Sequence, residues 1–203
     1  MICWRVEHSD LCIIIDPVIG DYDHGIYIDE RLVDAYRQFL LPLADGLTPN
    51  CFELAQLTGL AVNDIEKVIL AARTLLTGRT QWVAVTSAAP DAWTIGEMQV
   101  VLVTRTQSYV ITHPHLDVMP KGTGDLFCAA LTGHWLNGVC LPEAAVKACE
   151  HVVKTLQQVD QAQCAELLRP PMASSYDNNE IHAGEHLFTR IHLHTEPHLR
   201  NAS

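Results

Sequence analysis

Residues 11–21 read LCIIIDPVIGD, an unbroken apolar run followed by an acidic turn that contains a proline. A short run of this kind, rich in β-branched side chains, is typical of a strand buried on both faces of a parallel sheet. Ligands of open α/β sheets bind beyond the carboxyl ends of the strands. Asp16 and Asp21 therefore lie where a nucleotide and its metal ion would bind, although Asp-Pro and Gly-Asp are also common in solvated turns.

Strand and helix signals continue to alternate along the chain. A helix capped by Asp29 is predicted to reach about residue 43, and Asn63 with Glu66 resembles a capping box for a helix that ends before Gly78. Further helices are predicted at 51–57, 125–136 and 142–158, and strands at 82–86, 98–104 and 109–112. The last two strands are expected to be antiparallel because their connection is short. The sequence therefore predicts an α/β fold with a mostly parallel sheet that helices cover on both faces.

The composition excludes several classes of function. With 203 residues, of which 48% are hydrophobic, the chain is large and apolar enough for one domain with a buried core. Its formal charge of -11 disfavours binding to nucleic acid or to anionic lipid, but leaves a small anionic ligand open. Seven scattered cysteines without a C-x-x-C pair indicate a reducing compartment, and there is neither a signal-peptide pattern nor a long apolar run. We expect a cytoplasmic protein with no nucleic-acid or membrane partner.

The composition changes after residues 170–171, which are both proline. Residues 173–203 carry five of the eleven histidines and show no sustained periodicity. We expect this segment to be a poorly ordered, His-rich tail, and residues 1–172 to hold the folded part of the chain.

The sharpest chemical signal is KGTGDLF, residues 121–127. Gly122, Thr123 and Gly124 precede a predicted helix, and glycines let backbone N–H groups point at one spot without obstruction by a Cβ atom. The positive end of the helix dipole adds to this, so the turn suits the oxygens of a phosphate in transfer. Asp125, in the first turn, would accept a proton from an attacking hydroxyl. An ordinary helix start has a similar composition, so the heptapeptide is not decisive by itself.

Two further polar clusters lie at predicted strand or helix ends. In TPNCFEL, residues 48–54, Asn50 and Glu53 have the spacing of a helix cap, while Thr48 and Glu53 also offer oxygens to a phosphate–metal cluster. Thr86 and Ser87 end the predicted strand at 82–86, where their hydroxyls would meet phosphate or simply terminate the strand. Together with the glycine turn, these clusters are typical of phosphoryl transfer, in which positioning and electrostatics supply most of the catalysis. No Walker A sequence is present, so the chain is not a P-loop enzyme.

Four segments resemble the pyridoxal/pyridoxine/pyridoxamine kinases (vitamin B6 kinases) of the ribokinase-like superfamily. They are DPVIGD-x-x-x-GIY at 16–27, AYRQFLLPLADGLTPNCFEL at 35–54, WVAVTSA at 82–88 and KGTGDLFCA at 121–129. The similar stretch runs from about residue 9 to residue 158. Sugar kinases of the superfamily share the G-T-G-D sequence, and thiamine-pathway pyrimidine kinases share an Asp-Pro-Val turn. GIY and TPNCFEL favour the B6 enzymes.

The resemblance implies a three-layer α/β/α fold and ATP-dependent phosphorylation of the 5'-hydroxyl of pyridoxal, pyridoxine or pyridoxamine, with Mg2+ as cofactor. It implies that Asp125 is the catalytic base and that the turn at 122–124 forms the anion hole. The positions that match residues around the nucleotide are Asp16, Thr48, Glu53, Thr86 and His113. Those that match the metal site are Tyr27 and Glu53. Members of this family are usually homodimers.

The chain also departs from the family. Relatives begin with a strand, a vitamin-binding loop and further α/β units, roughly one hundred residues in all, before the Asp-Pro-Val turn. We therefore expect a ribokinase-like fold that lacks its N-terminal units, with residues 1–172 as its ATP-binding and catalytic part. Three interpretations stay open: a B6 kinase, a catalytically inactive nucleotide-binding fragment of such a kinase, and a related ribokinase-like pyrimidine kinase.

Overall fold

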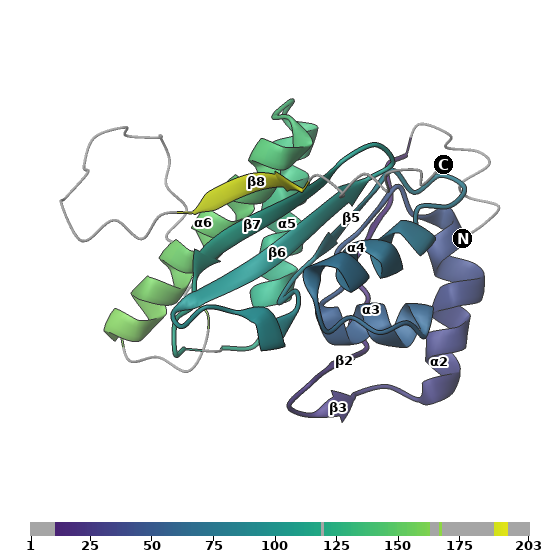
Figure 1. Cartoon of the computed structure of the whole chain (residues 1–203), viewed down its shortest axis with the longest axis horizontal. Helices are drawn as coiled ribbons and strands as arrows, with labels where there is room; N and C mark the ends of the chain where they lie inside the picture. Colours follow the sequence, from purple (N-terminus) through teal and green to yellow (C-terminus); the bar gives the residue numbers. More distant parts are fainter. Residues whose placement is uncertain (1–10, 119, 163–166, 168–188, 195–203) are drawn as a thin grey trace, which may run out of the picture.

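The computed structural model describes residues 11–118, 120–162, 167 and 189–194, and within them a six-stranded sheet forms the centre of the fold (Figure 1). In spatial order, its strands are β1 (Ile14–Ile15), β4 (Gly46–Leu47), β5 (Trp82–Val85), β6 (Glu97–Thr104), β7 (Ser108–Pro114) and β8 (Arg190–His194). β1, β4 and β5 are parallel neighbours, whereas β6, β7 and β8 each pair antiparallel to the strand before them. β1, β4, β5 and β7 consequently run in one direction, and the predicted antiparallel pair is confirmed.

Helices cover both faces of this sheet (Figure 1). α3 (Cys51–Thr58) and α4 (Ile65–Thr74) lie on one face, and α5 (Thr123–Leu136) and α6 (Leu141–Ala162) lie on the other. Successive side chains of β6 point alternately to the two faces of the sheet, as they do in any β-strand. Val101 and Val103 belong to the core beneath α3 and α4, whereas Val100 and Leu102 belong to the core beneath α5 and α6. The predicted three-layer α/β/α architecture is therefore confirmed.

The first helical segment differs from the prediction. Asp29 caps α2 (Glu30–Ala35) as expected, because its side chain accepts a hydrogen bond from the backbone N–H of Arg31. The α-helix then gives way to a π-helical turn, η1 (Tyr36–Leu40), and to a 3-10 turn, η2 (Leu41–Leu43). Pro42 has no N–H to donate to the Gln38 carbonyl, so α-helical bonding cannot resume after η1.

Two other predicted helix starts are shifted. Asp64, not Asn63, caps α4, since Asp64 Oδ1 accepts a hydrogen bond from the backbone N–H of Lys67 at 2.8 Å. Asn63 Oδ1 instead accepts a bond from the Lys67 ammonium group at 2.9 Å. α5 begins at Thr123, two residues earlier than predicted, because the left-handed Gly122 turns the chain directly into the helix.

Several short elements, including the central strand β4, are not predicted from the sequence. β2 (Gly20–Asp21) and β3 (Gly25–Ile26) form a hairpin apart from the main sheet, and η3 (Pro90–Ala92) is a single 3-10 turn after β5. β8 lies within residues 173–203, where the sequence predicts no regular structure, and it pairs with β7 at the sheet edge. Most of the tail at 173–203 lies outside the described residues.

Candidate active site

Polar side chains follow three neighbouring parallel strands at their carboxyl ends. Asp16 follows β1, Thr48 follows β4 and Thr86 follows β5. Thr48 Oγ1 donates a hydrogen bond to Asp16 Oδ1 at 2.9 Å, and Thr86 pairs with Asn50 in an isolated parallel bridge. Because parallel strands end at the same edge of a sheet, residues that are far apart in the sequence meet there. The sequence predicts this position for Asp16 and Thr86, whereas Thr48 reaches it through β4, which the sequence does not predict.

Three carboxylates influence one another at this edge. Burial raises the pKa of Asp16, the hydrogen bond from Thr48 opposes that rise, and the charge of Asp125 adds to it. Burial also raises the pKa of Glu53 to about 7, with a smaller contribution from Asp16. Asp16 Oδ2 lies 3.9 Å from the position that a Cβ atom would take on Gly124, so this carboxylate approaches the glycine turn closely. A cation bound here would offset the repulsion between the carboxylates and favour their charged forms.

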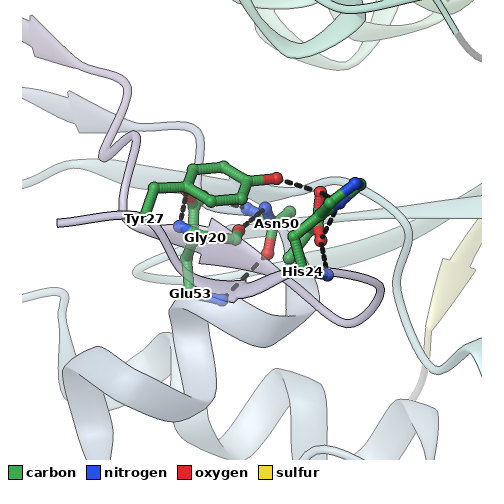
Figure 2. A network of polar contacts seen from close by, with 6 residues as sticks. Gly20, His24, Tyr27, Asn50 and Glu53 are labelled. Atoms are coloured by element: carbon green, nitrogen blue, oxygen red, sulfur yellow. Dashed lines mark hydrogen bonds and ion pairs between the residues drawn. The ribbon is translucent and has the colours of Figure 1, made fainter.

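Glu53 connects the start of α3 to the acidic turn after β1 (Figure 2). The residue is only 4% exposed, and its Oε1 accepts hydrogen bonds from the backbone N–H groups of Ile19 at 2.8 Å and Gly20 at 3.4 Å. Its Oε2 accepts a bond from the backbone N–H of Asn50, and Asn50 Oδ1 accepts one from the backbone N–H of Glu53, which confirms the predicted capping box. Asn50 Nδ2 also donates to the Gly20 carbonyl at 2.8 Å. This carboxylate therefore caps α3 and fixes the acidic turn at the same time.

Tyr27, one of the two predicted metal positions, follows β3 (Figure 2). Its backbone N–H donates to the Ile19 carbonyl at 2.8 Å, and its hydroxyl donates to the Asp21 carboxylate. Asp21 also accepts a bond from the backbone N–H of His24 at 2.7 Å. Burial and the Asp21 carboxylate raise the pKa of Tyr27 to about 12, so at neutral pH it presents a hydroxyl and not a phenolate. Tyr27 thus contacts the acidic turn after β1 through the carboxylate of Asp21.

The glycine turn forms the start of α5. Gly122 is the N-cap, with a φ of +94° that favours glycine. Because Gly122 has no side chain to cap the helix, the backbone N–H groups of Thr123, Gly124 and Asp125 are left for water or a ligand. An anion bound there would gain these donors together with the positive end of the helix dipole.

A pocket lies beside this turn, between the sheet and helices α5 and α6. Four of the predicted site residues line it: Thr86, His113, Thr123 and Gly124. The other lining residues are mostly apolar: Ser87, Met98, Val100, Pro114, Leu116, Phe127, Cys149, Val152 and Leu156. Burial lowers the pKa of His113, so its imidazole is neutral at physiological pH. An apolar pocket with a few polar groups next to an anion-binding turn suits a planar ring joined to phosphates.

Sequence reasoning missed most of the pocket wall. Met98, Phe127 and Cys149 come from three different elements, and apolar side chains give no chemical signal in a sequence. Ser87 has a φ of +47°, a conformation that is uncommon for a non-glycine residue and that clusters at functional sites. The sequence does single out Ser87, together with Thr86, as a hydroxyl at the end of a predicted strand, and the pocket lining includes both.

The residues at the carboxyl edge suit magnesium. Within the part of the chain that the structure describes, no three His, Cys, Asp or Glu side chains lie close enough to hold a metal ion by themselves. Magnesium does not need such a set, since it takes one or two carboxylates together with substrate phosphates and water. Asp16 and Glu53 fit this pattern. Among the described helices, none is both long and apolar enough to cross a membrane.

Several known kinases resemble this chain in sequence. A family model described as phosphomethylpyrimidine kinase matches residues 1–167. The pyridoxine/pyridoxal/pyridoxamine kinase of Bordetella bronchiseptica is 54% identical over 159 residues, which make up 78% of this chain and 56% of that kinase. The pyridoxal kinase of Arabidopsis thaliana is 36% identical over 155 residues, 75% of this chain and 49% of that kinase. The chain therefore spans about half the length of the curated relatives that it matches.

Solved kinase structures have the same fold. The pyridoxal kinase from Leishmania donovani, in complex with ADP and pyridoxamine, matches with a TM-score of 0.69 and 29% identity over 77% of this chain and 53% of that one. The pyridoxal kinase from Entamoeba histolytica matches with a TM-score of 0.67 and 25% identity over 82% of this chain and 60% of that one. Since the family model covers most of the sequence, the chain belongs to the phosphomethylpyrimidine kinase family.

Proposed function

We propose that this chain binds Mg2+-ATP and carries out the phosphoryl-transfer step of a vitamin B6 kinase. The observation that carries the proposal is the pocket in which Thr86, His113, Thr123 and Gly124 meet from different elements. Its apolar wall fits the adenine ring, and the glycine turn beside it fits the phosphates. The B6 substrate is proposed because curated relatives with identities of 54% and 36% are pyridoxine/pyridoxal/pyridoxamine and pyridoxal kinases.

The proposed roles rest on the resemblance to B6 kinases and on the position of Asp125 in the first turn of α5. Asp125 accepts the proton of the vitamin 5'-hydroxyl, whose oxygen then attacks the γ-phosphorus of ATP. The bond to the β–γ bridging oxygen breaks, and ADP leaves. Backbone N–H groups of the turn at 122–124 donate to the transferring phosphoryl oxygens, which carry most of the charge in the transition state.

Asp16, Thr48 and Glu53 are proposed to face the ATP phosphates on the other side of the site. When bound, Mg2+ would neutralise phosphate charge, with Glu53 and Asp16 as its protein neighbours. Tyr27 is proposed to act from a greater distance, by fixing Asp21 through its hydroxyl. His113, neutral and in the pocket wall, would lie against the nucleoside.

The test is formation of pyridoxal 5'-phosphate by the full chain with Mg2+-ATP and pyridoxal, measured next to direct binding of Mg2+-ATP. We expect Asp125→Asn to abolish product while nucleotide binding persists. Asp117→Asn is the matched control, because Asp117 is a fully exposed aspartate (104%) that precedes the same turn. Product formation that survives Asp125→Asn would overturn the assignment of the base.

A second candidate is nucleotide binding without transfer. It rests on the pocket beside the glycine turn, whose described lining suits a nucleotide. Binding of Mg2+-ATP with no product from pyridoxal or hydroxymethylpyrimidine would support this candidate. Product from hydroxymethylpyrimidine alone would instead indicate a pyrimidine kinase, as the family description suggests.

A further inference from the structure

β8 adds a strand to the kinase sheet from outside the family match. The family model ends at residue 167, whereas β8 covers Arg190–His194 (Figure 1, yellow). Five residue pairs join it to β7, from Thr112 opposite Arg190 to Ser108 opposite His194. β8 therefore covers the edge of β7, which would otherwise present unpaired backbone groups to solvent.

An ion pair ties this added strand to the rest of the sheet. Nη2 of Arg190 donates to Oε1 of Glu97 in β6, so the contact passes over β7 and joins three strands. The Arg190 side chain is 53% exposed and that of Glu97 is 35% exposed. Directly opposite residues of an antiparallel pair lie on the same face, which places Arg190 on the face of Thr112.

The ion pair lies behind the pocket wall. Glu97 precedes Met98 in β6, and Thr112 precedes His113 in β7. Met98 and His113 are register partners, and both line the pocket. Because neighbouring residues of a strand point to opposite faces, the ion pair lies on the opposite face from Met98 and His113. Pro114, the register partner of Glu97, lines the pocket as well, so the ion pair is directly next to the pocket wall.

We propose that β8, held by Arg190 and Glu97, fixes the end of the β6–β7 hairpin that forms the pocket wall, so that Arg190 is a positioning residue for the bound nucleotide. The effect on the nucleotide rests on the proposed function of the pocket. Arg190 acts from the opposite face of the sheet and does not touch the ligand. Its substitution therefore loosens the wall and weakens nucleotide binding without altering the reacting groups.

The experiment compares the full chain with Arg190→Ala, Glu97→Ala and the charge-reversed double variant Arg190→Glu/Glu97→Arg. Mg2+-ADP binding is measured by calorimetry, and amide hydrogen exchange is followed in β7. Each single variant is expected to weaken ADP binding about two- to fivefold, the range that an exposed ion pair can supply, and to speed exchange in β7. The double variant is expected to restore both the ADP affinity and the slow exchange in β7. Arg31→Ala, which removes an exposed ion pair with Asp29 on α2, is the matched control and should change neither.

The two measurements separate the two proposals. If the unsubstituted chain binds no Mg2+-ADP, the proposed function fails, and exchange in β7 still decides whether Arg190 holds the hairpin. Unchanged exchange in both single variants would overturn the role of the Arg190–Glu97 ion pair in holding the hairpin. Faster exchange with unchanged ADP affinity would overturn the positioning role of Arg190, because the hairpin would then loosen without any effect on the pocket.

Discussion

The buried carboxylate of Glu53 gives the folded chain a distinct dependence on pH. Burial raises the pKa of Glu53 from an ordinary 4.5 to about 7. The unfolded chain therefore loses this proton at a lower pH than the folded chain does. A group whose pKa is raised by folding contributes stability that is complete below its unfolded pKa and is lost as the pH rises through its folded pKa. The folded chain should accordingly lose stability between about pH 4.5 and about pH 7.

The size of this loss follows from the same two pKa values. The change from 4.5 to about 7 corresponds to ~3 kcal/mol of stability at most, since a tenfold change in an equilibrium constant is ~1.4 kcal/mol. Glu53→Gln removes the titration but keeps the size of the side chain and one carbonyl acceptor. It loses an acceptor for the backbone N–H groups, which lowers stability by an amount that does not depend on pH. The difference in unfolding free energy between the unsubstituted chain and Glu53→Gln should thus shift in favour of the variant as the pH rises.

The assay is urea unfolding at several pH values, followed by tryptophan fluorescence, to which Trp82 contributes as a buried residue that is 1% exposed. Divalent cations are left out so that no ion binds the carboxylates. Glu66→Gln is the control, because Glu66 is an exposed glutamate in the first turn of α4. A difference between Glu53→Gln and the unsubstituted chain that stays constant across the pH range would refute the reasoning. It would show that the backbone donors, and not burial, control the ionisation of Glu53.

Glycine positions give two further predictions. A Cβ atom on Gly46 would lie 2.2 Å from Cζ2 of Trp82, so Gly46→Ala should destabilise the fold by about 3 kcal/mol in urea unfolding, whereas Gly133→Ala, with open space around it, should not. A destabilisation by Gly46→Ala that is no larger than that by Gly133→Ala would contradict this. Gly122→Ala and Gly138→Ala both force alanine into a left-handed conformation, at +94° and +88°, and each should cost about 1–2 kcal/mol. Only Gly122→Ala should also weaken Mg2+-ATP binding, and equal weakening by both would argue against the anion site.

Local chemistry made much of the fold predictable. The capping box of Asn50 and Glu53, the cap at Asp29 and the left-handed Gly122 all follow from side chains acting on their own neighbourhood. The placing of Asp16 and Thr86 at one sheet edge could also be predicted, because parallel strands bring their carboxyl ends together. Thr48 joins them through β4, a two-residue strand that the sequence does not predict. The proposed chemical roles of these residues remain predictions that the experiments above test.

Features that depend on distant contacts could not be predicted. The pocket wall combines Met98, Phe127 and Cys149, which look like ordinary core residues until the helices are placed on the sheet. Likewise, nothing local to Glu53 shows that it also accepts hydrogen bonds from the turn after β1.

The sequence by itself determined the α/β class and the helix caps at Asp29 and Asn50, because each depends on periodicity or on neighbouring residues. Only the tertiary structure decided which side chains share a cavity and how β8 closes the edge of the sheet. β8 is short and largely exposed, so its pairing depends on the free edge of β7 and on Glu97, which no pattern within residues 190–194 can reveal. The pocket depends in the same way on packing between elements that are far apart in the chain.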